Sequence, residues 1–137
     1  MNTQTPGLQK LFIKAAKAGD VAALRLLLGE DASLVNVKDT DGSTPLHCAA
    51  WKGHTDAAAL LMEFGADVHA RNNNDHWGDT PLHATAHGNR RAVAELLIAK
   101  GADIHAKNAS DNTPLKETEA HCATAVATLL KKHGATH

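Results

Sequence analysis

The chain has 137 residues, with 14 Lys and Arg against 15 Asp and Glu, which gives a formal net charge of −1 at pH 7. Because no excess of positive charge is available to neutralise phosphate groups, we expect no nucleic-acid partner. No apolar run of 18 residues occurs, so no membrane-spanning helix is predicted, and the length fits a single domain.

The N-terminal part is predicted to divide into a short lead-in and a first structural unit. Residues 1–7 are polar, with no apolar signal-peptide region behind them, and we expect them to be flexible. Residues 8–36 contain an Ala pair, a Gly and a Leu pair, and each of these features returns at a constant phase further along the chain. We therefore predict that the first unit spans residues 8–36.

The unit at residues 37–70 shows the pattern most clearly. Thr44 is a suitable N-cap for a helix that begins with proline, whose missing N–H costs nothing at the first helical position. Gly53 supplies a left-handed residue that ends this short helix, and a second helix is predicted from about residue 55 to 64. An Asp-Gly step at 41–42 between strand-like flanks predicts a β-hairpin in front of the first helix.

The same pattern returns along the chain. The segment Thr-Pro-Leu-His at 44–47 recurs 36 residues later at 80–83, and a variant, Thr-Pro-Leu-Lys, follows after a further 33 residues at 113–116. Self-similarity at this period is typical of a solenoid, in which each unit buries its apolar face against its neighbours. The units are predicted at 8–36, 37–70, 71–106 and 107–137, with the first and last as caps.

This repeat resembles the ankyrin repeat family, over about residues 8–137. The resemblance implies an all-α solenoid of four helix-turn-helix units with projecting β-hairpin loops, and a concave front that binds other proteins. It also implies that His47 and His83 brace neighbouring loops through hydrogen bonds. The residues that carry the resemblance are Asp39, Gly42, Thr44, Pro45, Leu46, His47, Ala49, Ala50, Gly53, His54, Leu60, Leu61, Gly65, Ala66, Asp67 and Val68.

Several positions depart from the family pattern. Asn89 stands where the third unit needs a left-handed glycine, and Asn is the next best residue for that conformation. Cys122 takes the same position in the fourth unit, and Asp111 replaces its loop-tip glycine, which leaves the conformation of that tip open. Ala57 and Ala58 replace bulkier residues, so we expect the second unit to be thinly packed.

Both tryptophans, Trp51 and Trp77, are predicted to lie on the concave front, whereas Phe12 and Phe64 fall at packing positions. Tryptophan is enriched among residues that dominate binding energy, so we predict that both rings contact a partner. The alternative is that Trp51 lies flat on its neighbours and Trp77 stabilises its own loop. Polar partner contacts are predicted at Asp41, Ser43, Lys52, His76, Asp79 and His87.

The loop that contains Trp77 is longer than its counterparts. The interval from Val68 to Thr80 is twelve residues, and the equivalent intervals in the second and fourth units are nine. Insertions on one face of a solenoid often mark its binding face, and the tryptophan in this loop favours recognition over the alternative, drift in a tolerant loop.

Other function classes find less support in the sequence. No nucleophile lies beside a base in a catalytic motif, and no phosphate-binding loop or zinc-hydrolase signature occurs, so we expect neither an enzyme nor a cofactor. Ten histidines suggest a metal site, but His69 and His105 lack a second pair of ligands, so a histidine-based metal binder is the weaker alternative. A structural or self-associating module is a further alternative, although we expect a monomer.

The two cysteines indicate a reducing compartment. Cys48 and Cys122 lie two units apart, which the usual spacing of packed helices converts to roughly 16–20 Å, too far for a disulfide. We expect both to be buried or half-buried free thiols, which predicts a cytoplasmic location.

Overall fold

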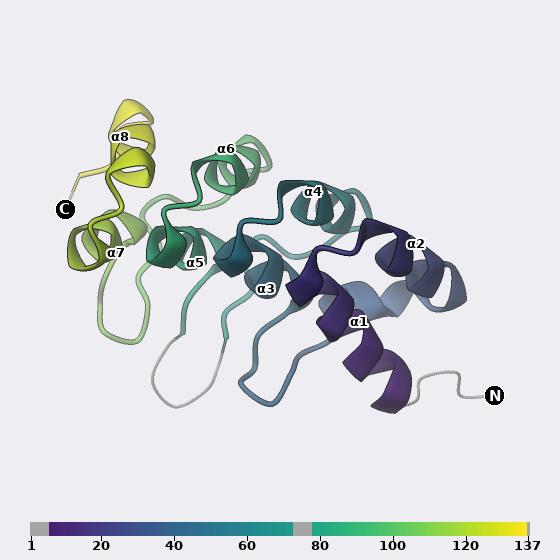
Figure 1. Cartoon of the computed structure of the whole chain (residues 1–137). Helices are drawn as coiled ribbons and strands as arrows, with labels where there is room; N and C mark the ends of the chain where they lie inside the picture. The colour runs from purple at the N-terminus through teal and green to yellow at the C-terminus, as the bar shows by residue number, and fades with distance from the viewer. Residues whose placement is uncertain (1–5, 73–77, 137) are drawn as a thin grey trace.

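A computed structural model describes residues 6–72 and 78–136, which form eight α-helices and one short 3-10 helix, η1 (Figure 1). α1 begins at Pro6, ahead of the boundary predicted at residue 8. The elements are α1 (Pro6–Ala18), α2 (Val21–Glu30), η1 (Ala32–Asn36), α3 (Pro45–Lys52), α4 (Thr55–Glu63), α5 (Pro81–Gly88), α6 (Arg91–Ala99), α7 (Pro114–His121) and α8 (Thr124–Lys132).

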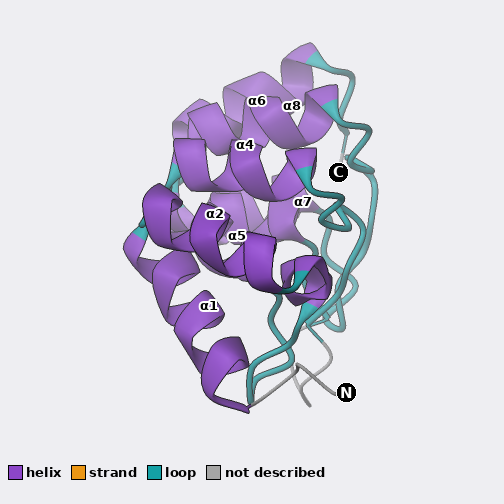
Figure 2. Cartoon of the chain, turned by 90° about the vertical axis from the view of Figure 1, so that its right-hand side faces the viewer, coloured by secondary structure: helices purple, strands orange, loops and turns teal. Residues whose placement is uncertain are grey.

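The helices form two layers of a linear stack. α1, α3, α5 and α7 follow one another in one layer, and α2, α4, α6 and α8 form the second layer behind it (Figure 1). Figure 2 shows the long loops together along one side of the helices. The chain is therefore a solenoid of four helix pairs, as its repeat predicted.

Local capping explains where the short helices begin and end. Thr44 accepts a hydrogen bond from the backbone N–H of His47, and Thr80 caps α5 in the same way. Gly53 ends α3 with a φ of 78°, and Asn89 ends α5 with a φ of 56°, which confirms the predicted left-handed positions. Cys122 keeps this geometry after α7 with a φ of 55°.

Two buried imidazoles tie each unit to the next. Nδ1 of His47 accepts the Thr44 backbone N–H at 3.2 Å, so Nε2 carries the proton and donates to the Asp79 carbonyl at 2.7 Å. His83 repeats the arrangement one unit later, with Nε2 donating to the Asn112 carbonyl at 2.8 Å. The bracing role implied by the family resemblance is therefore present at both positions.

The loops fold back as hairpins, but no β-strand forms within residues 6–72 and 78–136. Each described stem is closed by a backbone hydrogen bond from Asp39 to Ser43, Asn72 to Asp79, or Asn108 to Asn112. The first and third bonds span four residues and the second spans seven, which confirms the three-residue insertion. Strand pairing was predicted from the Asp-Gly turn. Each stem instead adds a turn bond, from Gly42 to Asp39, Gly78 to Asn72 or Asp111 to Asn108, and this is too little pairing for a strand.

The core is a continuous row of aliphatic side chains between the two layers. Ala57 and Ala58 are fully enclosed, as is Phe12. Two packing predictions are wrong: Phe64 is 43% exposed because it caps the end of α4, and Cys122 is exposed because it occupies a turn.

Candidate functional site

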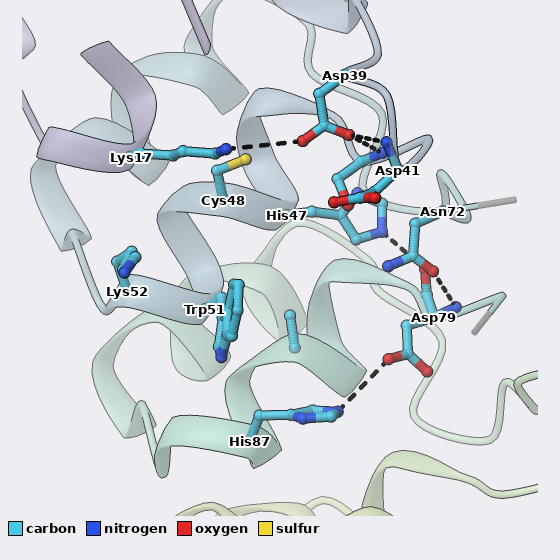
Figure 3. A pocket seen from close by; sticks show the side chains of 12 residues that line it. Lys17, Asp39, Asp41, His47, Cys48, Trp51, Lys52, Asn72, Asp79 and His87 are labelled. Carbon is cyan, nitrogen blue, oxygen red and sulfur yellow. Dashed lines mark hydrogen bonds and ion pairs between the residues drawn. The ribbon is translucent and has the colours of Figure 1, made fainter. Parts of the chain in front are cut away.

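A groove of about 410 Å³ opens on the front of the stack, between the short helices and the projecting loops. Figure 3 shows side chains from α1, α3, α5 and two loops pointing into it. Six of the eight residues predicted to bind a partner line this groove: Asp41, Ser43, Trp51, Lys52, Asp79 and His87.

Trp51 supplies the aromatic wall of the groove. It lies in the last turn of α3, and 56% of its surface is exposed. Nζ of Lys52 lies 5.5 Å from the ring centroid, within the range of a cation–π contact. Nε of Arg90 donates to the Trp51 carbonyl at 3.2 Å, which joins the end of α3 to the next unit. The backbone of Trp51 is therefore tied to the next unit, while its indole ring faces solvent.

The loop before α3 supplies the acidic rim. Asp39 accepts backbone N–H groups of Asp41 and Ser43 at 2.8 and 2.9 Å, so this loop tip is fixed by its own side chain. The other Asp39 oxygen lies 4.0 Å from Nζ of Lys17 on α1. The exposed Asp41 carboxylate is thus presented on an ordered loop, with cationic side chains nearby.

Asp79 and His87 form the far end of the groove, and both interact within the stack. Asp79 is only 4% exposed; its carboxylate accepts the Asn108 amide at 2.9 Å and faces Nε2 of His87 at 3.5 Å. Burial alone would raise the pKa of Asp79, but hydrogen bonding from His87 and Asn108 and the nearby His83 lower it. The hydrogen bond to Asp79 raises the pKa of His87, against the opposing effect of burial.

His76 and Trp77 lie outside the described residues. Among the described residues on either side of them, Asn72 accepts the Asp79 backbone N–H at 2.7 Å, and Arg71 donates to the Gly78 carbonyl at 3.0 Å. Two described residues of the loop, Asn72 and Asp79, line the groove.

The structure also brings together residues that the sequence analysis did not connect. Glu117 and His121 lie one turn apart on α7, and the His121 ring stacks on the His87 ring of α5 with centroids 4.2 Å apart. Asn108 bridges Asp79 and Glu117 through its amide nitrogen, at 2.9 and 2.7 Å. The four-residue spacing of Glu117 and His121 was visible in the sequence, but their meeting with His87 depends on how two units stack.

None of the helices in the described ranges reaches the length and apolar character that a bilayer crossing requires.

Comparison with known proteins places these features in a family. A family model for ankyrin repeats (3 copies) matches residues 1–72, and a second model for the ankyrin repeat matches residues 77–109. Ankyrin repeat domain-containing protein 49 from Mus musculus is 47% identical over 47 residues, which are 34% of this chain and 20% of that protein. The Homo sapiens protein of the same name is 45% identical over the same shares of both chains. The matched segment therefore spans a fifth of these relatives, and the chain belongs to the ankyrin repeat family.

Proposed function

We propose that this protein binds a protein partner through its front groove, with Trp51 as the central contact. Ankyrin repeats are generally protein–protein interaction modules without enzymatic activity, which sets the class of function. The observation that carries the proposal is the indole itself: a large aromatic side chain, 56% exposed, at the wall of a groove. Burial of this ring by a partner supplies more binding energy than burial of any other side chain in the groove.

The groove offers charges of both signs around this apolar centre. Lys17 and Lys52 are cationic, and Asp41 is an exposed anion at the loop tip. Ser43 adds a hydroxyl, and His87 adds an imidazole whose charge depends on pH. The partner that fits best presents an apolar side chain flanked by both acidic and basic residues.

Asp79 takes a different role from the direct contact that its sequence position predicted. Because its carboxylate is buried against Asn108 and His87, it acts in this proposal by positioning the His87 ring. Trp77 and His76 remain proposed partner contacts.

Rigidity supports recognition by a preformed surface. The loop tips are held by Asp39 and Asn108, and the imidazoles of His47 and His83 join consecutive units. Little conformational freedom is then lost when a partner docks, so most of the contact energy appears as affinity. The free thiols Cys48 and Cys122 support the cytoplasmic location that we propose with this function.

The experiment is affinity purification from the native host, followed by identification of the captured protein and measurement of its affinity for variants. Trp51→Ala combined with Trp77→Ala should weaken the complex by about 2 kcal/mol or more while the protein stays folded. Leu26→Ala is the matched control, since Leu26 is a 72% exposed apolar residue on α2, in the layer away from the groove.

Two outcomes would reject the proposal. An affinity that survives the double substitution places the binding site elsewhere on the molecule. A purified protein whose light scattering shows a concentration-dependent dimer, dispersed by Trp51→Ala, assigns the groove to self-association instead.

A further inference from the structure

A cluster of two imidazoles and a carboxylate lies at the end of the groove, across the third and fourth units. Ligand atoms of His87, Glu117 and His121 all lie within 4.8 Å of one another. From this geometry we infer that the cluster binds a divalent transition-metal ion such as Zn²⁺, with these three side chains as ligands. The inference does not depend on the proposed partner binding, because it concerns residues that meet within one chain.

The ligand set suits zinc. Zn²⁺ binds imidazole nitrogen and carboxylate oxygen at about 2.0–2.2 Å, so ligand atoms around one ion lie roughly 3–3.5 Å apart. Nε2 of His121 already lies 3.6 Å from Oε2 of Glu117. His121 is the most exposed of the three side chains, so its ring has the most room to turn toward His87 when an ion binds. Two imidazoles and one carboxylate leave a fourth position for water or for a partner's side chain.

Neighbouring amides orient the carboxylate. Asn108 and Asn112 donate to Oε1 of Glu117 at 2.7 and 3.3 Å, and Oε2 faces His121. Asp79 orients the His87 ring in the same way, because its Oδ2 lies 3.5 Å from Nε2 of that ring. Outer partners of this kind, which fix the direction of a metal ligand, typically change metal affinity by about 10–100-fold when removed.

The electrostatics favour a cation at this point. Two buried carboxylates, Asp79 and Glu117, share one neutral amide donor, that of Asn108. His87 and His121 lie in the last turns of α5 and α7, where the negative ends of the helix dipoles are located. The nearby Arg71 guanidinium binds the backbone carbonyls of Gly78 and Lys107. A divalent ion would therefore balance a concentrated negative charge.

No metal site was predicted from the sequence, because the pair His69 and His105 shows no second pair of ligands. His69 and His105 are exposed residues of adjacent units, and no third ligand joins them within residues 6–72 and 78–136. The cluster instead brings together His87 in the last turn of α5 and His121 in the last turn of α7, which differ by one residue in their positions within the repeat. Glu117, one turn earlier on α7, is the third member.

The test uses the full chain, purified without a histidine tag and treated with a chelator, and titrated with Zn²⁺ in competition with a chromogenic chelator. One tight site per chain is expected. His121→Ala and Glu117→Gln should each weaken that site by at least about tenfold, the lower end of what loss of an outer partner costs. Zn²⁺ should also raise the melting temperature of the unmodified protein, and raise that of His121→Ala less at the same concentration, because stabilisation follows the affinity of the folded state.

Two matched variants separate this site from adventitious binding. The double substitution His69→Ala and His105→Ala removes two exposed imidazoles that are not part of the cluster and should leave the affinity unchanged. Cys122→Ser removes the exposed thiol next to His121 and should also leave it unchanged. The inference is overturned if no stoichiometric Zn²⁺ site appears. It is equally overturned if both cluster variants keep full affinity, or if either control variant loses as much as they do.

Discussion

The imidazoles of His47 and His83 are the residues on which the front of the stack depends. Each accepts a hydrogen bond at Nδ1 and donates one at Nε2, so each needs the neutral form with the proton on Nε2. Burial lowers the pKa of both side chains, against the raising effect of the backbone carbonyls that they contact. Protonation would place a second N–H against the backbone N–H of Thr44 or Thr80, and one bond of each brace would be lost.

We predict that stability falls as the pH drops below about 6.5, the ordinary pKa of histidine in an unfolded chain. Because the folded-state pKa of His47 and His83 is lowered, the unfolded chain binds more protons in this range, and acid favours unfolding. His87 acts in the opposite direction, since its raised pKa contributes stability below 6.5 that is lost as the pH rises through its folded value. The stability lost at His47 and His83 together should exceed the stability gained at His87, so the melting temperature should be lower at pH 5.5 than at 7.5.

The matched control for this prediction is the double substitution His69→Ala and His105→Ala. Both side chains are exposed, so their removal should leave the difference between the two pH values intact. A melting temperature that does not change between pH 7.5 and 5.5 would show that the two imidazoles do not brace the stack.

The two thiols should differ in reactivity. Burial, reinforced by the carboxylate of Asp39, raises the pKa of Cys48 to about 11, so almost none of it is thiolate at pH 8. Cys122 is exposed in the turn after α7. A thiol reagent should therefore modify one cysteine per native chain quickly, and the second only after denaturation. Rapid modification of both in the native protein would contradict the enclosed position of Cys48.

At the scale of the element, α3, α5 and α7 each begin with a threonine N-cap, but a histidine contacts that cap only in α3 and α5. α3 and α5 have a Thr N-cap whose hydroxyl also contacts Nδ1 of a histidine three residues later, at 2.9 Å in both cases. α7 keeps the Thr113 cap but has Lys116 where the other two helices have the imidazole. The three helices thus form a natural series in which one interaction is absent.

We expect Thr44→Ala and Thr80→Ala each to cost about 2 kcal/mol, from loss of a cap and of a hydrogen bond to the histidine. Thr113→Ala should cost about 1 kcal/mol, because only the cap is lost. Urea denaturation of the three variants measures the difference directly. Equal losses for all three would mean that the contact between threonine and imidazole contributes nothing.

The helices could be predicted from the sequence because their signals are local. Thr44, Pro45 and Gly53 specify the start and the end of α3 without reference to the rest of the molecule, and the phase of the repeat brings Trp51 onto the front. The loop stems were predicted less well, since whether they pair as strands depends on their length in the folded stack. The cluster of His87, Glu117 and His121 could not be predicted, because it depends on the register between α5 and α7 and on the direction of each side chain.

At the scale of the whole molecule, the stack combines a closed back with an open front. The aliphatic core lies between the two helix layers, and the loops gather along one side (Figure 2). The groove on that front joins Trp51 from the second unit to His87 from the third, and the proposed metal ligands continue into the fourth. A partner that fills this groove would contact three consecutive units at once, so its affinity should depend on their relative placement.

Fluorescence of Trp51 tests the central claim most directly. In a Trp77→Phe variant Trp51 is the single indole, and its exposed ring should emit as a solvated tryptophan that acrylamide quenches readily. On addition of the captured partner, we predict a shift of the emission to shorter wavelength and a marked fall in quenching. A complex that forms while the emission and the quenching of Trp51 stay unchanged would show that the groove is not the binding surface.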